Sequence, residues 1–230
     1  MIVYDYIPET GEYNGTIEAQ ESPLELGVYL IPAHATTIAP PEAATGYVAV
    51  FADGAWSLIE DHRGKVYYDT LTRERHESKE LGPVPGKWTA IPPEDSEAVW
   101  DGTKWSVPFD VLKERKKREI TAARHAAIAA GTTWRDHLVD ADEDAQRALS
   151  AQIVKSMAYQ QLNRPIPDSP WRLKDGSYIT LSDADVWDLS QIIEAHVSGC
   201  YAREATLIAQ LETASSAEQL DAIKWNSQGE

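Results

Sequence analysis

The sequence is short of cysteine, of phenylalanine and of long hydrophobic runs. Its 230 residues include one cysteine, Cys200, which excludes an intrachain disulfide and a cysteine-rich zinc site. Such cysteine usage is typical of a protein made in a reducing cytosol. The N-terminal stretch MIVYDYIPETGEYNG lacks the basic and apolar regions of a signal peptide. Nowhere do about 18 consecutive apolar residues occur, so we expect no membrane insertion.

Positive charge is also scarce. Lys and Arg number 21 against 37 Asp and Glu, which leaves a formal net charge of −16. This balance argues against nucleic acid as the partner, because phosphate contacts need a basic surface. One basic cluster, KERKKRE at 113–119, is compatible with docking to nucleic acid or to an acidic partner. Its Glu114–Arg118 spacing favours a solvated helix face with paired charges.

The aromatic residues are unusual in kind. The chain has eight Trp and ten Tyr but two Phe, so most of its large rings carry a polar group. Such rings suit thin, partly hydrated β-structure and protein interfaces better than one deep core.

The chain changes character near residue 109. Before it, Pro and Gly separate short runs of Val, Ile, Tyr and Trp, which indicates strands and turns. After it, Ala, Gln, Glu and Arg recur with helical spacing. We therefore expect an α+β protein with two domains. A Pro-rich antiparallel β domain with hairpins occupies 1–109, and a helical domain with one inserted hairpin at 171–181 occupies 110–230.

In the β half, a turn is expected over 9–15, and Pro-rich arms over 22–46 and 81–93. Each arm either wraps the protein's own sheet or presents an ordered surface to a partner. The expected strands and hairpins are 2–7, a short strand at 28–31, a three-stranded meander of 47–51, 55–61 and 65–70, and a hairpin over 98–107.

Two hairpins of this half echo each other. FADGAW and VWDGTKW both join a strand to a Trp-bearing strand through an Asp-Gly turn, at Asp53-Gly54 and Asp101-Gly102. Paired aromatics on a hairpin are in the first place a stabilising device. Exposed Trp pairs also form good contact surfaces, which is the alternative.

The helical half carries clear start and stop signals. Ser182 and Asp185 form a capping box before the longest helix, and Gly131 ends the first one. We expect antiparallel packing of the helices, with the hairpin as a flap. The expected helices are 111–130 capped by Asp110, 142–162 with an Ala145, Leu149, Ile153 and Met157 stripe, 183–213, and a short one from Ser216 through Trp225. The apolar stripe expected on the longest helix is Val186, Leu189, Ile193, Val197, Tyr201, Ala205, Ile208 and Leu211.

Asp61, His62 and Arg63 are the first candidates for catalysis. In a strand, Asp61 and Arg63 point to one face and His62 to the other, so the three do not converge. No nucleophile motif accompanies them. We therefore interpret them as scaffold and expect Arg63 to form a bidentate pair with a carboxylate, which would hold the turn or a neighbouring loop.

Metal and glycosidase chemistry receive no specific support. The six histidines form no H-E-x-x-H motif, and there is no C-x-x-C, so we expect neither a metal nor a cofactor. His196 is interpreted as a core histidine. Carboxylates such as Asp53 and Glu60 are numerous, but abundance in an acidic chain does not define a glycosidase pair. We expect no enzymatic activity.

The order of several motifs resembles a known family. These motifs are Pro32–Thr36, Trp56 before Asp61-His62-Arg63-Gly64, Leu81-Gly82, Pro92-Pro93, and the Trp100-to-Trp105 hairpin. Together they resemble tail fibre assembly and tail-fibre-associated proteins of contractile-tailed bacteriophages and prophages. The stretch 171–223 resembles a helical domain of uncharacterised function found at the ends of phage tail proteins.

The resemblance implies a chaperone that binds the distal, receptor-binding end of a trimeric tail fibre in the host cytoplasm. In some phages such a protein stays on the virion, at the tip of the fibre. The alternative is a permanent component of the tail tip or baseplate that takes part in host attachment. No catalytic residues come with the family, and the oligomeric state of the chain itself is left open. We expect the β half to contact the fibre through Trp56, Arg63, Tyr67, Trp88, Trp100 and Trp105.

Overall fold

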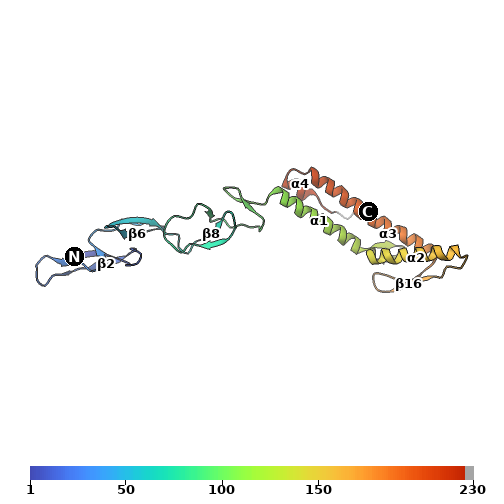
Figure 1. The fold of residues 1–230 in the computed structure, drawn as a ribbon, viewed down its shortest axis with the longest axis horizontal. Helices are drawn as coiled ribbons and strands as arrows, with labels where there is room; N and C mark the ends of the chain where they lie inside the picture. Colours follow the sequence, from blue (N-terminus) through green and yellow to red (C-terminus); the bar gives the residue numbers. More distant parts are fainter. Residues whose placement is uncertain (226–230) are drawn as a thin grey trace. The chain divides into compact units, whose positions relative to one another are not determined.

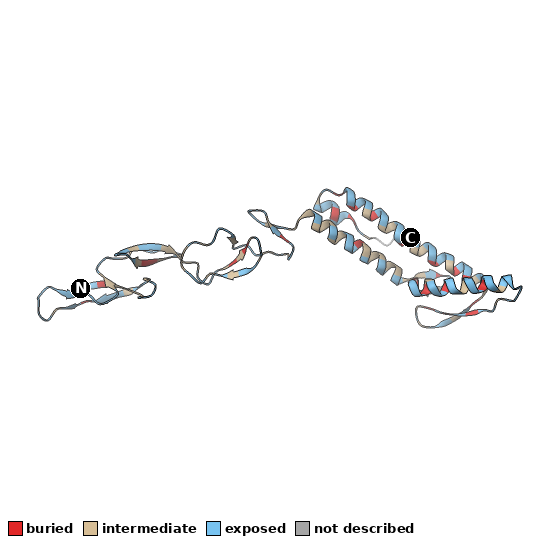
Figure 2. Ribbon diagram, in the orientation of Figure 1, coloured by how far each residue is buried: buried red, intermediate tan, exposed pale blue. Residues whose placement is uncertain are grey.

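The chain folds as two compact units, Met1–Val107 and Pro108–Glu230. The computed structural model describes residues 1–225, so the last five residues of the expected 110–230 domain lie outside it. Strands dominate the first unit and helices the second (Figure 1), which confirms the α+β class. Buried residues occupy short stretches of the strands in the first unit and recurrent positions on the helices in the second (Figure 2).

The first unit is built from short antiparallel strands. Two three-stranded sheets have the orders β2-β1-β5 and β10-β8-β9, and β3–β4, β6–β7 and β11–β12 form two-stranded hairpins. The strands are β1 (Ile2–Tyr6), β2 (Tyr13–Glu18), β3 (Gln20–Glu21), β4 (Tyr29–Leu30), β5 (Ala35–Thr36), β6 (Tyr47–Ala52), β7 (Ala55–Glu60), β8 (Val66–Asp69), β9 (Arg75–Glu77), β10 (Trp88–Thr89), β11 (Val99–Trp100) and β12 (Trp105–Ser106).

The expected three-stranded meander is wrong in its pairing. The strands β6, β7 and β8 all form, and Asp53 and Gly54 make the expected tight turn with φ of 52° and 82°. However, β8 pairs with β9 and β10 instead of with β7. The reason lies at Gly64, whose N–H donates to the carbonyl of Ser78 at 2.9 Å. The turn at Gly64, with φ of 75°, separates β7 from β8, and this bond continues the β8–β9 ladder.

Each Pro-rich arm contributes one strand to the protein's own sheets. The first arm adds β5 to the edge of β1, and the second adds β10 to the edge of β8. The expected strand at 28–31 forms as β4. Five strands of this unit were not expected: the arm strands β5 and β10, the two-residue β3, and the strands β2 and β9. β2 begins inside the stretch expected to be a turn, and β9 (RHE) lacks the apolar alternation that marks a strand.

The echo between the two hairpins extends over the whole first unit. In both sheets the strand that comes first in the chain is central, the second strand lies on one side, and the arm strand lies on the other. The registers match: Tyr4 pairs with Thr36 as Tyr68 pairs with Thr89. We call residues 1–60 module one and residues 65–106 module two.

The hydrogen bonds of the arms repeat as well. The carbonyl of Pro32 accepts from the N–H of Ala35 at 3.3 Å, and the carbonyl of Pro85 accepts from that of Trp88 at 2.9 Å. Further along each arm, a threonine hydroxyl accepts from the N–H of an isoleucine at 3.2 Å, in both modules. Module two is therefore a second, shorter copy of the module one fold.

In each module, one indole N–H forms a hydrogen bond to the Pro-rich arm. Trp56 Nε1 donates to the carbonyl of Ile38 at 2.8 Å, and Trp105 Nε1 donates to the carbonyl of Ile91 at 2.8 Å. Both tryptophans lie on the second strand of an aromatic hairpin and oppose an aromatic residue on the first strand. Each indole thus fastens a Pro-rich arm to the hairpin that follows it.

The second unit consists of four helices and two small hairpins in its described part. In chain order these are α1 (Phe109–Ala130), β13 (Thr132–Trp134), β14 (His137–Val139), α2 (Glu143–Gln161), β15 (Ser169–Arg172), β16 (Tyr178–Leu181), α3 (Asp183–Thr213) and α4 (Ala217–Ala222). The capping box of Ser182 and Asp185 is present, as expected. The short last helix ends at Ala222, before Trp225.

Several details of this unit differ from expectation. Asp110 does not cap α1, because the helix begins at Phe109 and places Asp110 in its first turn. The β13–β14 hairpin was not foreseen, because Arg135 supplies the left-handed residue of its turn, with φ of 51°, where glycine is usual. The β15–β16 hairpin is no loose flap, since Trp171 and Leu181 are buried in the core.

Two clusters of buried residues lie along α3. The first joins its N-terminal half to α2 and to both hairpins, and the second joins its C-terminal half to α1 and α4. The stripe expected on α3 is partly wrong, because Cys200 and Leu207 are buried whereas Tyr201 and Ala205 are exposed. Steps of four residues drift around a helix of 3.6 residues per turn, and the buried face instead follows a seven-residue spacing. On α2, Met157 is likewise exposed.

The indole bonds generate a paired prediction. Trp56→Phe and Trp105→Phe each keep a ring but remove the N–H donor, which should destabilise the local arm by about 1 kcal/mol. Backbone amides of the affected arm, around β5 or β10 respectively, should then exchange about fivefold faster in hydrogen-exchange mass spectrometry.

The control is Trp187→Phe in the second unit, where the indole makes no hydrogen bond within residues 1–225. It should leave both arms unchanged. Equal protection of the arms in all three variants would contradict the role assigned to the indoles.

Candidate partner-binding surface

Trp56 lies at the centre of an aromatic cluster in module one. Its ring centroid is 5.1 Å from Phe51, 5.7 Å from Tyr13 and 6.3 Å from Tyr6. The contacts with the two tyrosines are edge-to-face, which is a favoured aromatic geometry. Strands β1, β2, β6 and β7 supply these rings, so Trp56 is half-buried and firmly positioned.

Arg63 joins module one to the junction that precedes module two. Its Nη1 and Nη2 donate to the two carboxylate oxygens of Glu12 at 3.0 and 2.7 Å. Its Nε and Nη2 donate to Asp61, both at 2.9 Å. The bidentate pair expected from the sequence is therefore confirmed, and its partner lies 51 residues away.

These contacts change the acidity of the two carboxyls. Hydrogen bonds from Arg63, first from its side chain and then from its backbone, lower the pKa of Asp61 to about 2. The same guanidinium lowers the pKa of Glu12 below its ordinary value. Both carboxylates therefore hold Arg63 in its charged pair throughout the neutral range.

The side chain of His62 makes different contacts from this pair, although β7 ends at Glu60, so that strand alternation, from which we expected the separation, does not apply to residues 61–63. Its Nε2 lies 2.8 Å from a carboxylate oxygen of Glu60, and its Nδ1 lies 3.1 Å from the hydroxyl of Tyr67. The two sets of contacts are thus separate. Asp61, His62 and Arg63 form a structural junction, not a convergent catalytic group.

The remaining residues expected to contact a partner form two pairs. Tyr67 and Trp88 stack with centroids 6.3 Å apart, and Trp88 stacks on His76 at 4.6 Å. Trp100 and Trp105 meet edge-to-face at 5.3 Å on the β11–β12 hairpin. Tyr67 is only 8% exposed, so it lies beneath the surface. The tryptophans of both pairs are half-buried.

The structure thus gathers the six residues into separate groups. Tyr67 with Trp88 and Trp100 with Trp105 make direct contacts, whereas Trp56 packs on rings of module one and Arg63 on carboxylates. A role of these residues in partner contact stays a prediction.

The most exposed apolar feature was missed by the sequence analysis. Residues 20–31, which contain β3 and β4, form what we call the apolar hairpin. Leu24 and Leu26 at its tip are 92% and 98% exposed. The other exposed hydrophobic residues of the hairpin are Val28, Tyr29, Leu30 and Ile31. The signal in the sequence is the apolar density of PLELGVYLI, within the segment expected to be an extended arm.

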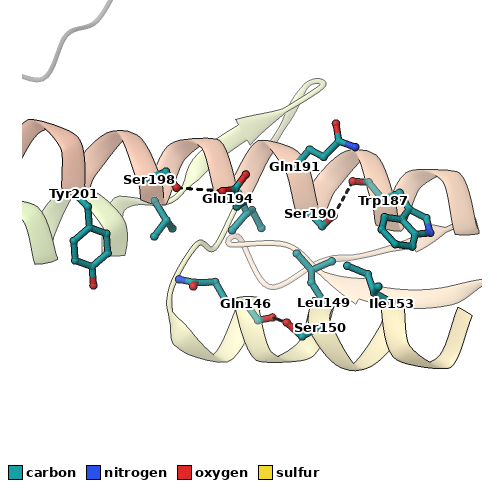
Figure 3. Close-up of a pocket in the computed structure, with 12 residues that line it drawn as sticks. Gln146, Leu149, Ser150, Ile153, Trp187, Ser190, Gln191, Glu194, Ser198 and Tyr201 are labelled. Atoms are coloured by element: carbon teal, nitrogen blue, oxygen red, sulfur yellow. Dashed lines mark hydrogen bonds between the residues drawn. The ribbon is translucent and has the colours of Figure 1, made fainter. Parts of the chain in front are cut away.

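A groove of about 590 Å³ lies between α2 and α3 in the second unit (Figure 3). Leu149, Ile153 and Val197 are among its apolar lining, and Trp187 and Tyr201 lie toward its two ends. Its polar groups are amides, hydroxyls and one carboxylate. Several of them bond locally: Ser198 Oγ donates to Glu194 Oε1 at 3.2 Å, Ser190 Oγ to the Trp187 carbonyl at 2.8 Å, and Ser150 Oγ to the Gln146 carbonyl at 2.9 Å. A single carboxylate cannot provide the paired acid and base of a glycosidase.

The sole thiol is not poised for catalysis. Burial raises the pKa of Cys200, so the thiol form is favoured. Its neighbour His196 lies 3.1 Å from the carbonyl of Ala127, which links α3 to α1. His196 is half-buried and belongs to neither core cluster, so it is a hydrogen-bonded contact residue and not the core histidine that we expected. Within residues 1–225, no group of three or more His, Cys, Asp or Glu side chains could hold a metal ion. None of the described helices has the length and apolar character needed to cross a membrane.

Two protein-family models match the chain, one in each unit. Residues 1–59 match the model described as the N-terminal domain of tail fiber assembly proteins. Residues 111–224 match a domain of unknown function, DUF4376. No solved structure matches the chain.

Several curated relatives align with large parts of the sequence. The tail fiber assembly protein of Escherichia phage lambda is 33% identical over 141 residues, which cover 60% of this chain and 71% of the relative. The prophage homologue TfaE of Escherichia coli K12 is 34% identical over 71% of this chain and 74% of its own length. The homologue TfaR of the same strain is 39% identical over 54% of this chain, and the match spans 63% of that relative.

The Arg63 junction generates a prediction on pH. The pKa of Asp61 is lower in the folded chain than its ordinary value of 3.8, so its stabilising contribution is complete above about pH 4. That contribution is lost as the pH falls toward 2. Arg63→Gln removes the charged donor, and the pKa of Asp61, followed by NMR of the carboxyl carbon, should rise toward 3.8.

Asp101 provides the control for this titration. Its pKa is lowered by backbone N–H groups of its own turn, those of Lys104 and Thr103, and should stay low in the Arg63→Gln variant. An unchanged pKa of Asp61 would show that Arg63 is not the cause of its acidity.

Proposed function

Because the chain belongs to the family of tail fibre assembly proteins, we propose that it is an assembly chaperone for a phage tail fibre. It binds the distal, receptor-binding end of the trimeric fibre in the host cytoplasm. The β-rich region 1–109 makes the contact, and 110–230 is a separate helical domain. The membership of the chain in the family is the observation that carries this proposal.

The physical need for such a chaperone follows from the fold of its partner. A fibre tip made of intertwined β-structure has high contact order, so it folds slowly and exposes unpaired strand edges meanwhile. A partner that covers these edges suppresses aggregation until the trimer closes. The net charge of −16 would keep such a complex in solution by repulsion between copies.

Features of the first unit support contact through β-structure. β2 is an edge strand of six residues, and all but one of them are exposed. The aromatic hairpins and Pro-rich arms are held in place by the indole bonds, so little conformational entropy is lost when they bind. The proposal includes no catalytic step, in keeping with the separate contacts of Asp61, His62 and Arg63.

Co-expression with the cognate tail fibre protein tests the proposal. The wild-type chain should raise the yield of soluble trimeric fibre, measured by size-exclusion chromatography, above that obtained without it. Fibre solubility that does not depend on the chain would contradict the proposal.

Two core variants of the full chain show which unit acts. Val3→Asp places a charge in the buried centre of β1 and should abolish the rescue, while the helical circular dichroism of the second unit persists. Leu189→Asp disrupts the core of the second unit and should retain the rescue. The reverse pattern would assign fibre binding to the helical unit.

Mass spectrometry of purified virions separates a chaperone from a permanent tail component. A released chaperone should be absent from particles, and its presence at stoichiometric amounts would indicate retention at the fibre tip or in the tail. Absence excludes the permanent structural role in host attachment.

A further inference from the structure

We infer that the apolar hairpin, residues 20–31, is a docking element that inserts into an apolar, cation-rimmed site on the tail fibre. This inference rests on the proposed function, from which it takes its partner. It assigns contact with the fibre to a segment that contains none of the residues expected from the sequence to bind a partner. Three observations carry it: dispensability for the fold, exposure, and charge.

Module two shows that the apolar hairpin is not needed to build a module. The N–H of Ala19 donates to the carbonyl of Met1 at 2.9 Å, and the N–H of Ser78 donates to that of Lys65 at 2.9 Å, so these two positions are equivalent. Pro32 and Pro85 are equivalent in the same way. Between them module one has twelve residues, 20–31, and module two has six, 79–84.

The extra residues form an ordered hairpin with an apolar tip. Gln20 and Glu21 pair with Leu30 and Tyr29, and a carboxylate oxygen of Glu21 accepts from the N–H of Gly27 at 2.6 Å. The turn therefore holds Leu24 and Leu26 outward, on either side of Glu25. A pre-ordered apolar tip loses little entropy on binding, and its nearly complete exposure leaves the full area of both leucines to be buried.

Charge indicates the kind of surface that the hairpin fits. Residues 1–62 contain ten Asp or Glu side chains and no Lys or Arg. Glu18, Glu21 and Glu25 belong to this set and lie in or beside the hairpin. A partner site would therefore combine an apolar pocket with Lys or Arg at its rim. A second copy of this chain, with its net charge of −16, and an anionic membrane both fit poorly.

The first test removes the apolar tip without touching the core. The double variant L24S/L26S should bind the purified trimeric fibre tip at least tenfold more weakly than wild type in calorimetry, because burial of each leucine is worth about tenfold in affinity. The matched control L71S/L162S changes two leucines that are 81% and 64% exposed elsewhere. It should bind as wild type does.

A chimera tests the hairpin as a unit. Residues 20–31 are replaced by residues 79–84 of the same chain, which make the equivalent connection in module two. The exchange of the β1 and β2 amides should stay as slow as in wild type, while binding to the fibre tip is lost to the same extent as in L24S/L26S. Wild-type affinity of a folded chimera would overturn the docking role.

The charge argument has its own variant. Glu25→Lys should lower the affinity for the fibre tip relative to wild type, because it places a cation opposite the cationic rim. This loss should be larger at low salt than at high salt, because salt screens the repulsion. Equal or tighter binding at low salt would overturn the cation-rimmed site.

The outcomes separate this inference from the proposed function. If wild type fails to bind the fibre tip, the proposed function fails and this inference with it. If wild type and L24S/L26S bind equally, only the docking role of the hairpin fails. If wild type self-associates in sedimentation and L24S/L26S does not, the occupant is a second copy, and the assignment to the fibre is wrong.

Discussion

In each module of the first unit, an indole N–H bonded to an isoleucine carbonyl holds a Pro-rich arm against a small sheet. The unit depends on such bonds because its sheets are too small to enclose a deep core. Its buried hydrophobic residues are Val3, Ala19, Ala49, Val50, Tyr67 and Ala98. Three of these are alanines, whose burial contributes little. Order in this unit therefore comes from hydrogen bonds and ion pairs between neighbouring segments. These are the indole bonds, the threonine–isoleucine hydrogen bonds of the arms and the contacts of Arg63.

This construction explains why the aromatic residues are mostly Trp and Tyr. A phenylalanine at position 56 or 105 would pack on the hairpin but leave the isoleucine carbonyl without its donor. The tryptophans fulfil both tasks and remain half-exposed. The exposed strand edges and the apolar hairpin thus lie on a surface whose segments are held in place, which supports the assembly role that we propose. The second unit is built differently, with α3 passing through two separate clusters of buried side chains.

Much of the architecture could be predicted because its signals are local. The Asp53-Gly54 turn, the capping box at Ser182 and the bounds of the long helices are set by residues within a few positions of one another. The failures all involve distant partners or absent signals. β8 pairs with β9 and β10 because of contacts that its own residues do not specify. The turn at Arg135 has no glycine to mark it, and the charged strand β9 lacks the alternation of apolar and polar residues that marks a strand. The stripe on α3 depends on where α1 and α2 lie, which spacing alone does not define.

The sequence by itself determined the class of the protein, the division between strands and helices near residue 109, and the scaffold role of Asp61, His62 and Arg63. The expectation that these side chains do not converge is met, but not through strand alternation, because β7 ends at Glu60 and Arg63 lies in the turn that follows. Only the tertiary structure decided that Arg63 pairs with Glu12, 51 residues away, and that the echo of two hairpins is a repeat of the whole module. Only the tertiary structure shows that Leu24 and Leu26 form an exposed tip. Burial depends on which segments pack together, and that packing involves residues far apart in the chain.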